Sequence, residues 1–173
     1  MLATHYRKKG FVVACQDEAT FGLIPNVVRG WSKKGSHPIA QQNYQHKHTN
    51  VFGARTKRTF VFSFSQRKNQ RRFVAFLEDL LKRWGRVCLF ADNGPGHRGK
   101  IVDEFLTSHR KTFQIIPFLK YCPELNPVEP CWKPARKAVG NRLITSLATL
   151  RYHLQKVLSN PFLMPKMFNY LSD

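Results

Sequence analysis

The segment VCLFAD (residues 87–92) is a run of five apolar residues that ends in an acid. A second segment of similar form, FVVACQDE (11–18), lies near the start of the chain. Short apolar runs of this length are typical of buried strands. Each run places an aspartate, Asp17 or Asp92, where the apolar stretch ends. If the two strands are parallel neighbours, both carboxylates emerge at the same edge of the sheet.

Three further segments predict the rest of the sheet. NVFGAR (50–55) and TFVFSFS (59–65) flank a short basic turn, and we interpret them as an antiparallel pair. The second of these runs alternates phenylalanine with smaller residues, as a half-buried strand does. FQIIPF (113–118) predicts another short strand. We expect residues 25–50 to form a loop with a short ribbon.

Helical spacing of apolar residues predicts helices over 69–84 and 99–109, and a last helix that Thr145 or Ser146 caps. The Pro-rich stretch 120–134 contains another helix start. There Asn126 can cap a helix with Pro127 at its first position and Glu129 in its first turn. Pro134 lies deeper and predicts a kink or a later start.

This order of elements predicts an α/β fold in which a central mixed sheet has helices on its faces. The antiparallel part, which contains the hairpin, should lie beside a parallel part. We expect one domain over residues 1–173, with a lead-in at 1–10 and a C-terminal helical appendage at 145–173.

The charge balance indicates a polyanionic partner. Lys and Arg number 29 against 10 Asp and Glu, which gives a net charge of +19. Nucleic acid is the leading candidate. An anionic membrane is a weaker one, because the basic residues are not gathered on one amphipathic helix. A basic ribosomal or chromatin-type protein without activity is also compatible with the charge.

The cysteines and the absence of long apolar runs bear on the compartment. Cys15 and Cys88 lie inside the predicted buried strands, and no CxxC pair occurs. The sequence has no signal peptide and no apolar run of membrane-spanning length. We therefore expect a reducing, intracellular setting without a membrane partner.

Three acids stand apart from the others. Glu78, Asp79, Asp103 and Glu104 fall on the polar faces of predicted helices, where charges are usually only solvated. Asp17 and Asp92 end strands, and the helix that begins near Glu129 can return to the same edge. Carboxylates held close together suit a hard divalent metal ion. In a basic protein, three of them suggest two-metal phosphoryl chemistry.

Simpler interpretations exist for each of these residues. Asp17 could form a strand-end turn, and Glu129 could be an acid that the helix dipole favours. The loop DNGPGH (92–97) could be a tight turn that needs glycine. Alternatively, its backbone approaches a phosphate or a metal ion, and Asn93 and His97 contact a phosphate or position a water molecule.

Several segments resemble the DDE transposases of the mariner-like superfamily, in particular their bacterial insertion-sequence relatives. The segments QDEATFGL (16–23), RGWSKKG (29–35), LFADNGPGHRGK (89–100) and PELNPVEPCW (123–132) carry the resemblance. It extends from about residue 10 to about residue 155 in the expected order.

The resemblance implies an RNase H-like fold, with three antiparallel strands followed by two parallel ones. It implies that Asp17, Asp92 and Glu129 are catalytic and bind two Mg²⁺ ions, with Mn²⁺ as a substitute. In the implied reaction, water attacks a phosphodiester at a transposon end, and the freed 3′-hydroxyl then attacks target DNA. The resemblance further implies a homodimer that holds two transposon ends.

Family members usually carry helix-turn-helix domains before the catalytic domain, and this chain begins almost at the first catalytic strand. We therefore expect the helix-turn-helix part to be separate or missing. Two other functions stay open: a DNA-binding protein of the same fold that has lost catalysis, and another RNase H-like nuclease.

We expect the protein to act in the cytoplasm, associated with the nucleoid. Nine basic residues are predicted to include phosphate contacts: Lys33, Lys34, Arg55, Lys57, Arg58, Arg67, Lys68, Arg71 and Arg72.

Overall fold

A computed structural model of the chain describes residues 2–24, 26–39, 41–118 and 126–165. Its core is a five-stranded sheet with the strand order β3-β2-β1-β4-β5. The strands are β1 (Val12–Gly22), β2 (His48–Arg55), β3 (Phe60–Ser65), β4 (Val87–Ala91) and β5 (Phe113–Pro117). β1, β2 and β3 pair antiparallel, whereas β4 pairs parallel with β1 and β5 parallel with β4. The predicted mixed sheet is confirmed.

Within the described residues, five α-helices and two short 3-10 helices accompany the sheet. The α-helices are α1 (Leu2–Lys8), α2 (Gln70–Trp84), α3 (Lys100–Ser108), α4 (Glu129–Val139) and α5 (Leu147–Leu158). The 3-10 helices are η1 (Pro95–His97) and η3 (Pro161–Leu163). None of the helices within the described ranges is long and apolar enough to cross a membrane.

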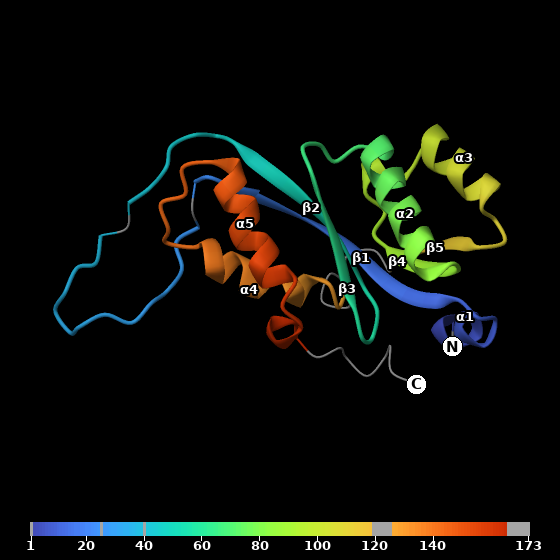
Figure 1. Cartoon of the computed structure of the whole chain (residues 1–173), viewed down its shortest axis with the longest axis horizontal. Helices are drawn as coiled ribbons and strands as arrows, with labels where there is room; N and C mark the ends of the chain where they lie inside the picture. Colours follow the sequence, from blue (N-terminus) through green and yellow to red (C-terminus); the bar gives the residue numbers. More distant parts are fainter. Residues whose placement is uncertain (1, 25, 40, 119–125, 166–173) are drawn as a thin grey trace.

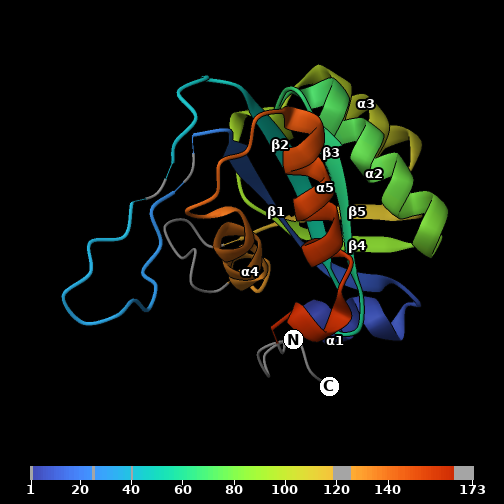
Figure 2. The ribbon, with the colours of Figure 1, turned by 60° about the vertical axis from the view of Figure 1, so that its left-hand side comes forward.

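The helices form two layers, one on each face of the sheet (Figures 1 and 2). α2 and α3 cover one face through a cluster that includes Phe73, Leu77 and Phe105. α4 and α5 cover the other face through a cluster that includes Trp132 and Leu154. Because side chains alternate along a strand, neighbouring residues of β1 enter different clusters.

The helix boundaries follow from capping residues. The side chain of Asn69 accepts a hydrogen bond from the backbone N–H of Arg72 and begins α2, and Gly85 ends it with a positive φ of 73°. The side chain of Ser146 accepts from the N–H of Thr149, so that Ser146, of the two predicted candidates, caps α5.

In the N-terminal part, the structure adds a helix to the predicted lead-in, and the predicted end of the first strand is wrong. The predicted lead-in contains helix α1, whose Tyr6 packs edge-on against the ring of Phe11. β1 does not end at Asp17 but continues to Gly22, because β2 pairs with it along that whole stretch. The predicted strand and helix at 87–92 and 69–84 are confirmed as β4 and α2.

The connection between β1 and β2 projects from the body of the fold (Figures 1 and 2). No short ribbon forms among its described residues, 26–39 and 41–47. Its base is fixed to the α4–α5 connection: Asn43 donates to the carbonyl of Ile144 over 2.7 Å, and Asn141 exchanges two hydrogen bonds with the backbone of Val28. Residues 29–39 are exposed throughout.

The prolines near Glu129 are compatible with a helix. α4 begins at Glu129, later than Asn126 predicted, and Pro130 lies in its first turn, where no backbone donor is needed. Asn126 still shapes this start, because its side chain accepts from the N–H of Val128 over 3.1 Å. α4 then continues through Pro134 to Val139.

Trp132 of α4 packs directly on the sheet at Gly53. A Cβ atom on Gly53 would lie 2.7 Å from Cη2 of Trp132 and 2.9 Å from Cζ of Phe60. Glycine inside a strand often marks such a close approach. The sheet therefore accepts the indole only because residue 53 has no side chain.

We predict that Gly53→Ala lowers the free energy of unfolding by about 1–3 kcal/mol, because it overpacks a filled core. Gly22→Ala is the matched control: its nearest neighbour would be the carbonyl oxygen of Lys47 at 3.7 Å, an ordinary contact. Urea unfolding of both variants measures the difference. Equal stability of the two variants would contradict the proposed close packing.

Candidate active site

The register between β1 and β4 brings two of the predicted catalytic acids to the same level. Cys15 lies opposite Phe90, and this is the last parallel pair between the two strands. Asp17 and Asp92 each follow two residues later. Because parallel strands run in the same direction, both residues lie at one edge of the parallel part of the sheet, as the sequence predicted.

Trp132 fixes the carboxylate of Asp17. Its indole Nε1 donates a hydrogen bond of 2.7 Å to Oδ2 of Asp17. Asp17 lies opposite Gly53 in the antiparallel ladder, so the glycine that admits the indole is the cross-strand neighbour of this acid. A bond to a carboxylate is stronger than one between neutral groups. The helix that carries Glu129 is therefore joined to the strand that carries Asp17.

The charges at this edge act on one another. Burial and, to a smaller extent, the carboxylates of Glu129 and Asp92 together raise the pKa of Asp17 to about 6, against the opposing effect of the Trp132 hydrogen bond. Glu129, in the first turn of α4, is exposed. The three predicted acids are thus close enough for each of the other two to disfavour the charge on Asp17.

Asp92 is held by the loop that follows it. Its Oδ1 accepts the N–H of Gly94 over 3.0 Å and lies 2.6 Å from Nδ1 of His97. The other ring nitrogen of His97 lies 2.8 Å from Oε1 of Glu18, and Lys68 approaches the second oxygen of Glu18 at 3.9 Å. His97 therefore bridges the end of β4 to β1.

The environment of His97 explains its charge. Its side chain is 6% exposed and lies over the ring of Phe73, with centroids 4.1 Å apart. Burial lowers the pKa of His97, but its bonds to the carboxylates of Asp92 and Glu18 outweigh that effect and raise it to about 9. The same bond lowers the pKa of Asp92. The imidazolium is the stable form at neutral pH.

This arrangement differs from the predicted role of His97. Both ring nitrogens are engaged by carboxylates, so the side chain is not presented to a phosphate or to a water molecule in this structure. Asn93, the other residue predicted for that role, is exposed.

The acids have the donor chemistry of a divalent metal site. Oxygen ligands suit Mg²⁺ and Mn²⁺, and a nearby cation would offset the burial and the repulsion that raise the pKa of Asp17. In the described ranges, however, no three His, Cys, Asp or Glu side chains are gathered closely enough to hold a metal ion. The bond of Asp92 to His97 is one physical reason, since it directs Oδ1 of Asp92 to the imidazole.

Sequence reasoning missed the roles of Glu18, Trp132 and Gly53. Glu18 follows Asp17 in a strand and therefore faces the opposite side of the sheet, where it meets His97. A second acid next to Asp17 and a glycine inside a predicted strand were the available signals. Nothing in the sequence pairs Trp132 with Asp17, because 115 positions separate them.

Most of the predicted phosphate contacts are on the surface, and Arg55 is an exception. Eight of the nine are exposed around the loops and the start of α2: Lys33, Lys34, Lys57, Arg58, Arg67, Lys68, Arg71 and Arg72. Of these, Lys68 approaches the carboxylate of Glu18. Arg55 is only 7% exposed, because strand alternation directs it to α4, where it donates to Sγ of Cys131. It is therefore unsuited to meet DNA.

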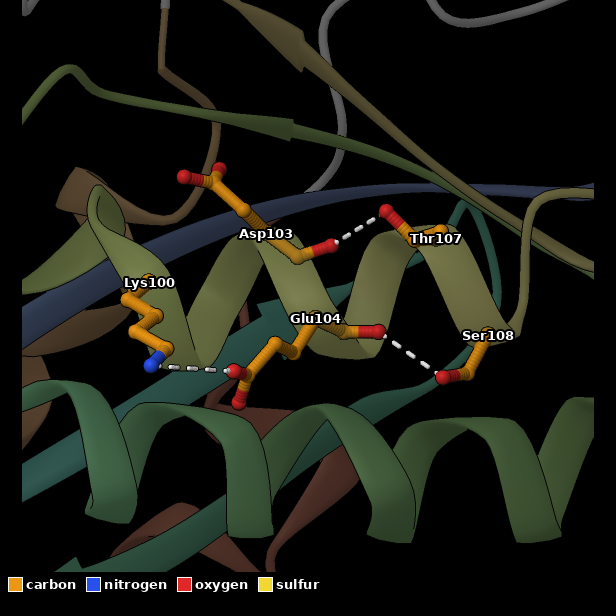
Figure 3. Close-up of a pocket in the computed structure, with 5 residues that line it drawn as sticks. All are labelled: Lys100, Asp103, Glu104, Thr107 and Ser108. Carbon is orange, nitrogen blue, oxygen red and sulfur yellow. Dashed lines mark hydrogen bonds and ion pairs between the residues drawn. The ribbon is translucent and has the colours of Figure 1, made fainter.

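One hollow lies away from the acids, on the outer face of α3 (Figure 3). Several of its polar groups have partners within the helix: Thr107 donates to the carbonyl of Asp103, Ser108 donates to that of Glu104, and Lys100 lies 4.0 Å from the Glu104 carboxylate. Asp103 is exposed to solvent, and we do not assign the hollow a function.

The order and the directions of the five strands are those of an RNase H-like fold. Residues 12–151 match the family model of the DDE superfamily endonucleases, and the chain belongs to this family.

Solved structures of Mos1 transposase have a similar fold. The Mos1 mariner paired-end complex with Mn superposes with a TM-score of 0.68 at 19% identity, and covers 91% of this chain and 52% of the Mos1 chain. The Mos1 strand transfer complex has a TM-score of 0.66 at 19% identity, and the match covers 91% of this chain and 50% of the Mos1 chain. The catalytic domain of Mos1 mariner transposase has a TM-score of 0.62 at 18% identity, and the match covers 91% of this chain and 76% of the Mos1 chain.

This chain thus spans about half the length of the longer Mos1 chains. The comparison with curated protein sequences gives no match.

The raised pKa of Asp17 predicts a pH-dependent loss of stability. A carboxyl whose folded pKa exceeds its unfolded value of 3.8 costs stability as the pH rises toward 6. The shift corresponds to about 2–3 kcal/mol. Between pH 4 and pH 6.5, we expect the free energy of unfolding of Asp17→Asn to rise by about 2 kcal/mol relative to that of the wild type. Urea unfolding in the presence of EDTA measures this difference.

Asp92 and His97 also have shifted pKa values, but they affect the stability outside this pH window. The stabilising bonds of His97 are fully present below pH 6.5 and lost as the pH rises through about 9, and those of Asp92 are lost only below pH 3.8. Asp79→Asn, on the exposed side of α2, is the control. A stability difference for Asp17→Asn that does not change with pH would contradict the proposed burial of this charge.

Proposed function

We propose that the chain is the catalytic domain of a transposase, which hydrolyses a phosphodiester at a transposon end and joins the freed 3′-hydroxyl to target DNA. The placement of Asp17, Asp92 and Glu129 near one edge of the sheet carries this proposal. The net charge of +19 and the membership of the DDE superfamily endonucleases support DNA as the substrate. We place this activity at the nucleoid.

Asp17, Asp92 and Glu129 would hold two Mg²⁺ or Mn²⁺ ions, and solved complexes of Mos1 with Mn and with Mg support this choice. When bound, such ions stabilise the attacking and leaving oxygens of phosphoryl transfer.

Neighbouring residues determine which carboxylate oxygens are available as metal ligands. Trp132 holds one oxygen of Asp17. Within the described residues, Oδ2 of Asp92 and the carboxylate of Glu129 accept no hydrogen bond, so they are available as ligands.

The exposed basic residues are the proposed DNA footprint. Arg67, Arg71 and Arg72 lie at the start of α2, next to the loop that holds His97. Lys57 and Arg58 lie in the β2–β3 turn, and Lys33 and Lys34 lie in the projecting β1–β2 connection. Each phosphate that such a residue neutralises releases counterions and strengthens binding at low salt.

A second copy of the chain is the proposed partner of the projecting connection. Trp31 and Ile39 are 105% and 94% exposed on it, and Tyr44 is 81% exposed. Large apolar side chains gathered on an extended segment favour burial against another protein surface. Two copies would hold two transposon ends, and recognition of the end sequence would belong to a separate helix-turn-helix part.

A DNA-binding protein of the same fold without catalysis is the second candidate. The bond between Asp92 and His97 favours it, since His97 competes with a metal ion for Oδ1 of this acid. Both candidates require salt-dependent DNA binding, but only the first requires a metal ion for a chemical step.

We predict that Asp92→Asn abolishes metal-dependent DNA strand cleavage, with a loss of at least about 10³-fold, because it removes one carboxylate from the site. The measurement is release of a labelled strand from a duplex with Mn²⁺, supplemented with an end-binding domain. EDTA should stop the wild-type reaction.

Asp103→Asn, on the exposed face of α3, is the matched control and should cleave like the wild type. Circular dichroism of both variants confirms that the fold persists. Cleavage by Asp92→Asn at the wild-type rate would refute the assignment, and salt-dependent binding without cleavage by the wild type would favour the second candidate.

A further inference from the structure

A basic hollow lies at the end of the sheet opposite the acids. It has a volume of about 460 Å³ and lies where β1, β4 and β5 begin. In Figure 1, α1 and the turn between α3 and β5 lie near these strand starts. Its lining residues are Tyr6, Lys9, Phe11, Arg86, Arg110, Lys111 and Gln114.

Four cations from three separate connections meet in this hollow without an acid. Lys9 precedes β1, Arg86 precedes β4, and Arg110 and Lys111 lie in the turn before β5. None of the described acids lines the hollow, and within the described residues none of the four cations forms an ion pair.

Contacts within the protein hold several of the residues that line the hollow. The guanidinium of Arg86 lies 4.4 Å from the ring centroid of Phe11 and donates to the carbonyl of Lys9 over 2.8 Å. Gln114 donates to the carbonyl of Arg110 over 2.6 Å, which steadies the turn that carries the other two cations. These contacts leave Lys9, Arg110 and Lys111 exposed at the rim.

The helix ends nearby do not neutralise this charge. α2 and α3 end just before Arg86 and Arg110, and each helix C-terminus contributes only about half a negative charge. Four positive charges therefore keep an excess, and a bound anion would lower their mutual repulsion.

We propose that this hollow binds the phosphate backbone of duplex DNA, at a position remote from the acids. From Phe11 to Asp17 the chain runs along β1 for six residues, about 20 Å at 3.3 Å per residue. A duplex that crosses the acid edge would reach the hollow roughly six nucleotide steps away, at 3.4 Å per step. The hollow then anchors the DNA flanking the scissile phosphate.

This inference rests on the proposed action on DNA, and the test separates the two. The variant Arg110→Gln/Lys111→Gln removes two exposed charges and leaves the supporting contacts of Arg86 in place. Arg142→Gln/Lys156→Gln removes two exposed charges elsewhere and is the matched control. Binding of a fluorescent 30-base-pair duplex is followed by anisotropy as a function of NaCl concentration.

We expect the plot of log affinity against log salt to become shallower by about 1–2 units for the hollow variant and to keep the wild-type slope for the control. An unchanged slope for the hollow variant overturns the inference alone, and so does an equal change in both variants, which would report net charge. Absence of salt-dependent binding by the wild type overturns the proposed function as well.

A parallel titration uses phosphatidylserine vesicles. If the hollow variant loses vesicle binding while its duplex binding is intact, the hollow serves a membrane surface and the inference is overturned. The unfolding temperature of each variant is also measured. A value equal to that of the wild type excludes loss of the fold as the cause of either result.

Discussion

The parallel register between β1 and β4 is the constraint on which the site depends. It places Asp17 and Asp92 two residues beyond the same pair, Cys15 and Phe90. A shift of one residue would turn one of these side chains to the opposite face of the sheet. α4 then brings Glu129 to this edge, because its Trp132 packs over Gly53 and bonds to Asp17. Backbone pairing and one close packing contact thus determine that the three acids lie near the same edge of the sheet.

Acids that lie close together repel one another, and on balance the structure stabilises the charge of Asp92 but not that of Asp17. Asp17 is buried beside Glu129 and Asp92, and its pKa rises to about 6. Asp92 is instead stabilised by the His97 imidazolium, which Glu18 supports from β1. A buried carboxylate whose charge is also disfavoured by neighbouring acids is the property expected of a site that takes up a cation.

Much of the fold could be predicted from the sequence because strands and helices have strong local patterns. The apolar runs before Asp17 and Asp92 predicted β1 and β4, and the spacing of leucines predicted α5. The length of β1 could not be predicted, since β2 continues the pairing to Gly22. The burial of Arg55 was also missed, because it depends on which face α4 covers. Contacts such as Trp132–Asp17 arise only in the folded chain.

Binding of Mn²⁺ at the acid edge is the central claim, and calorimetric titration of Mn²⁺ tests it most directly. The wild-type chain, Asp92→Asn and Asp103→Asn are titrated with and without a DNA duplex. We predict that the wild type and Asp103→Asn bind Mn²⁺ and that Asp92→Asn binds it at least about tenfold more weakly, which corresponds to 1.4 kcal/mol. Equal binding by all three proteins, or no binding by the wild type even with DNA present, would contradict the assignment of the site.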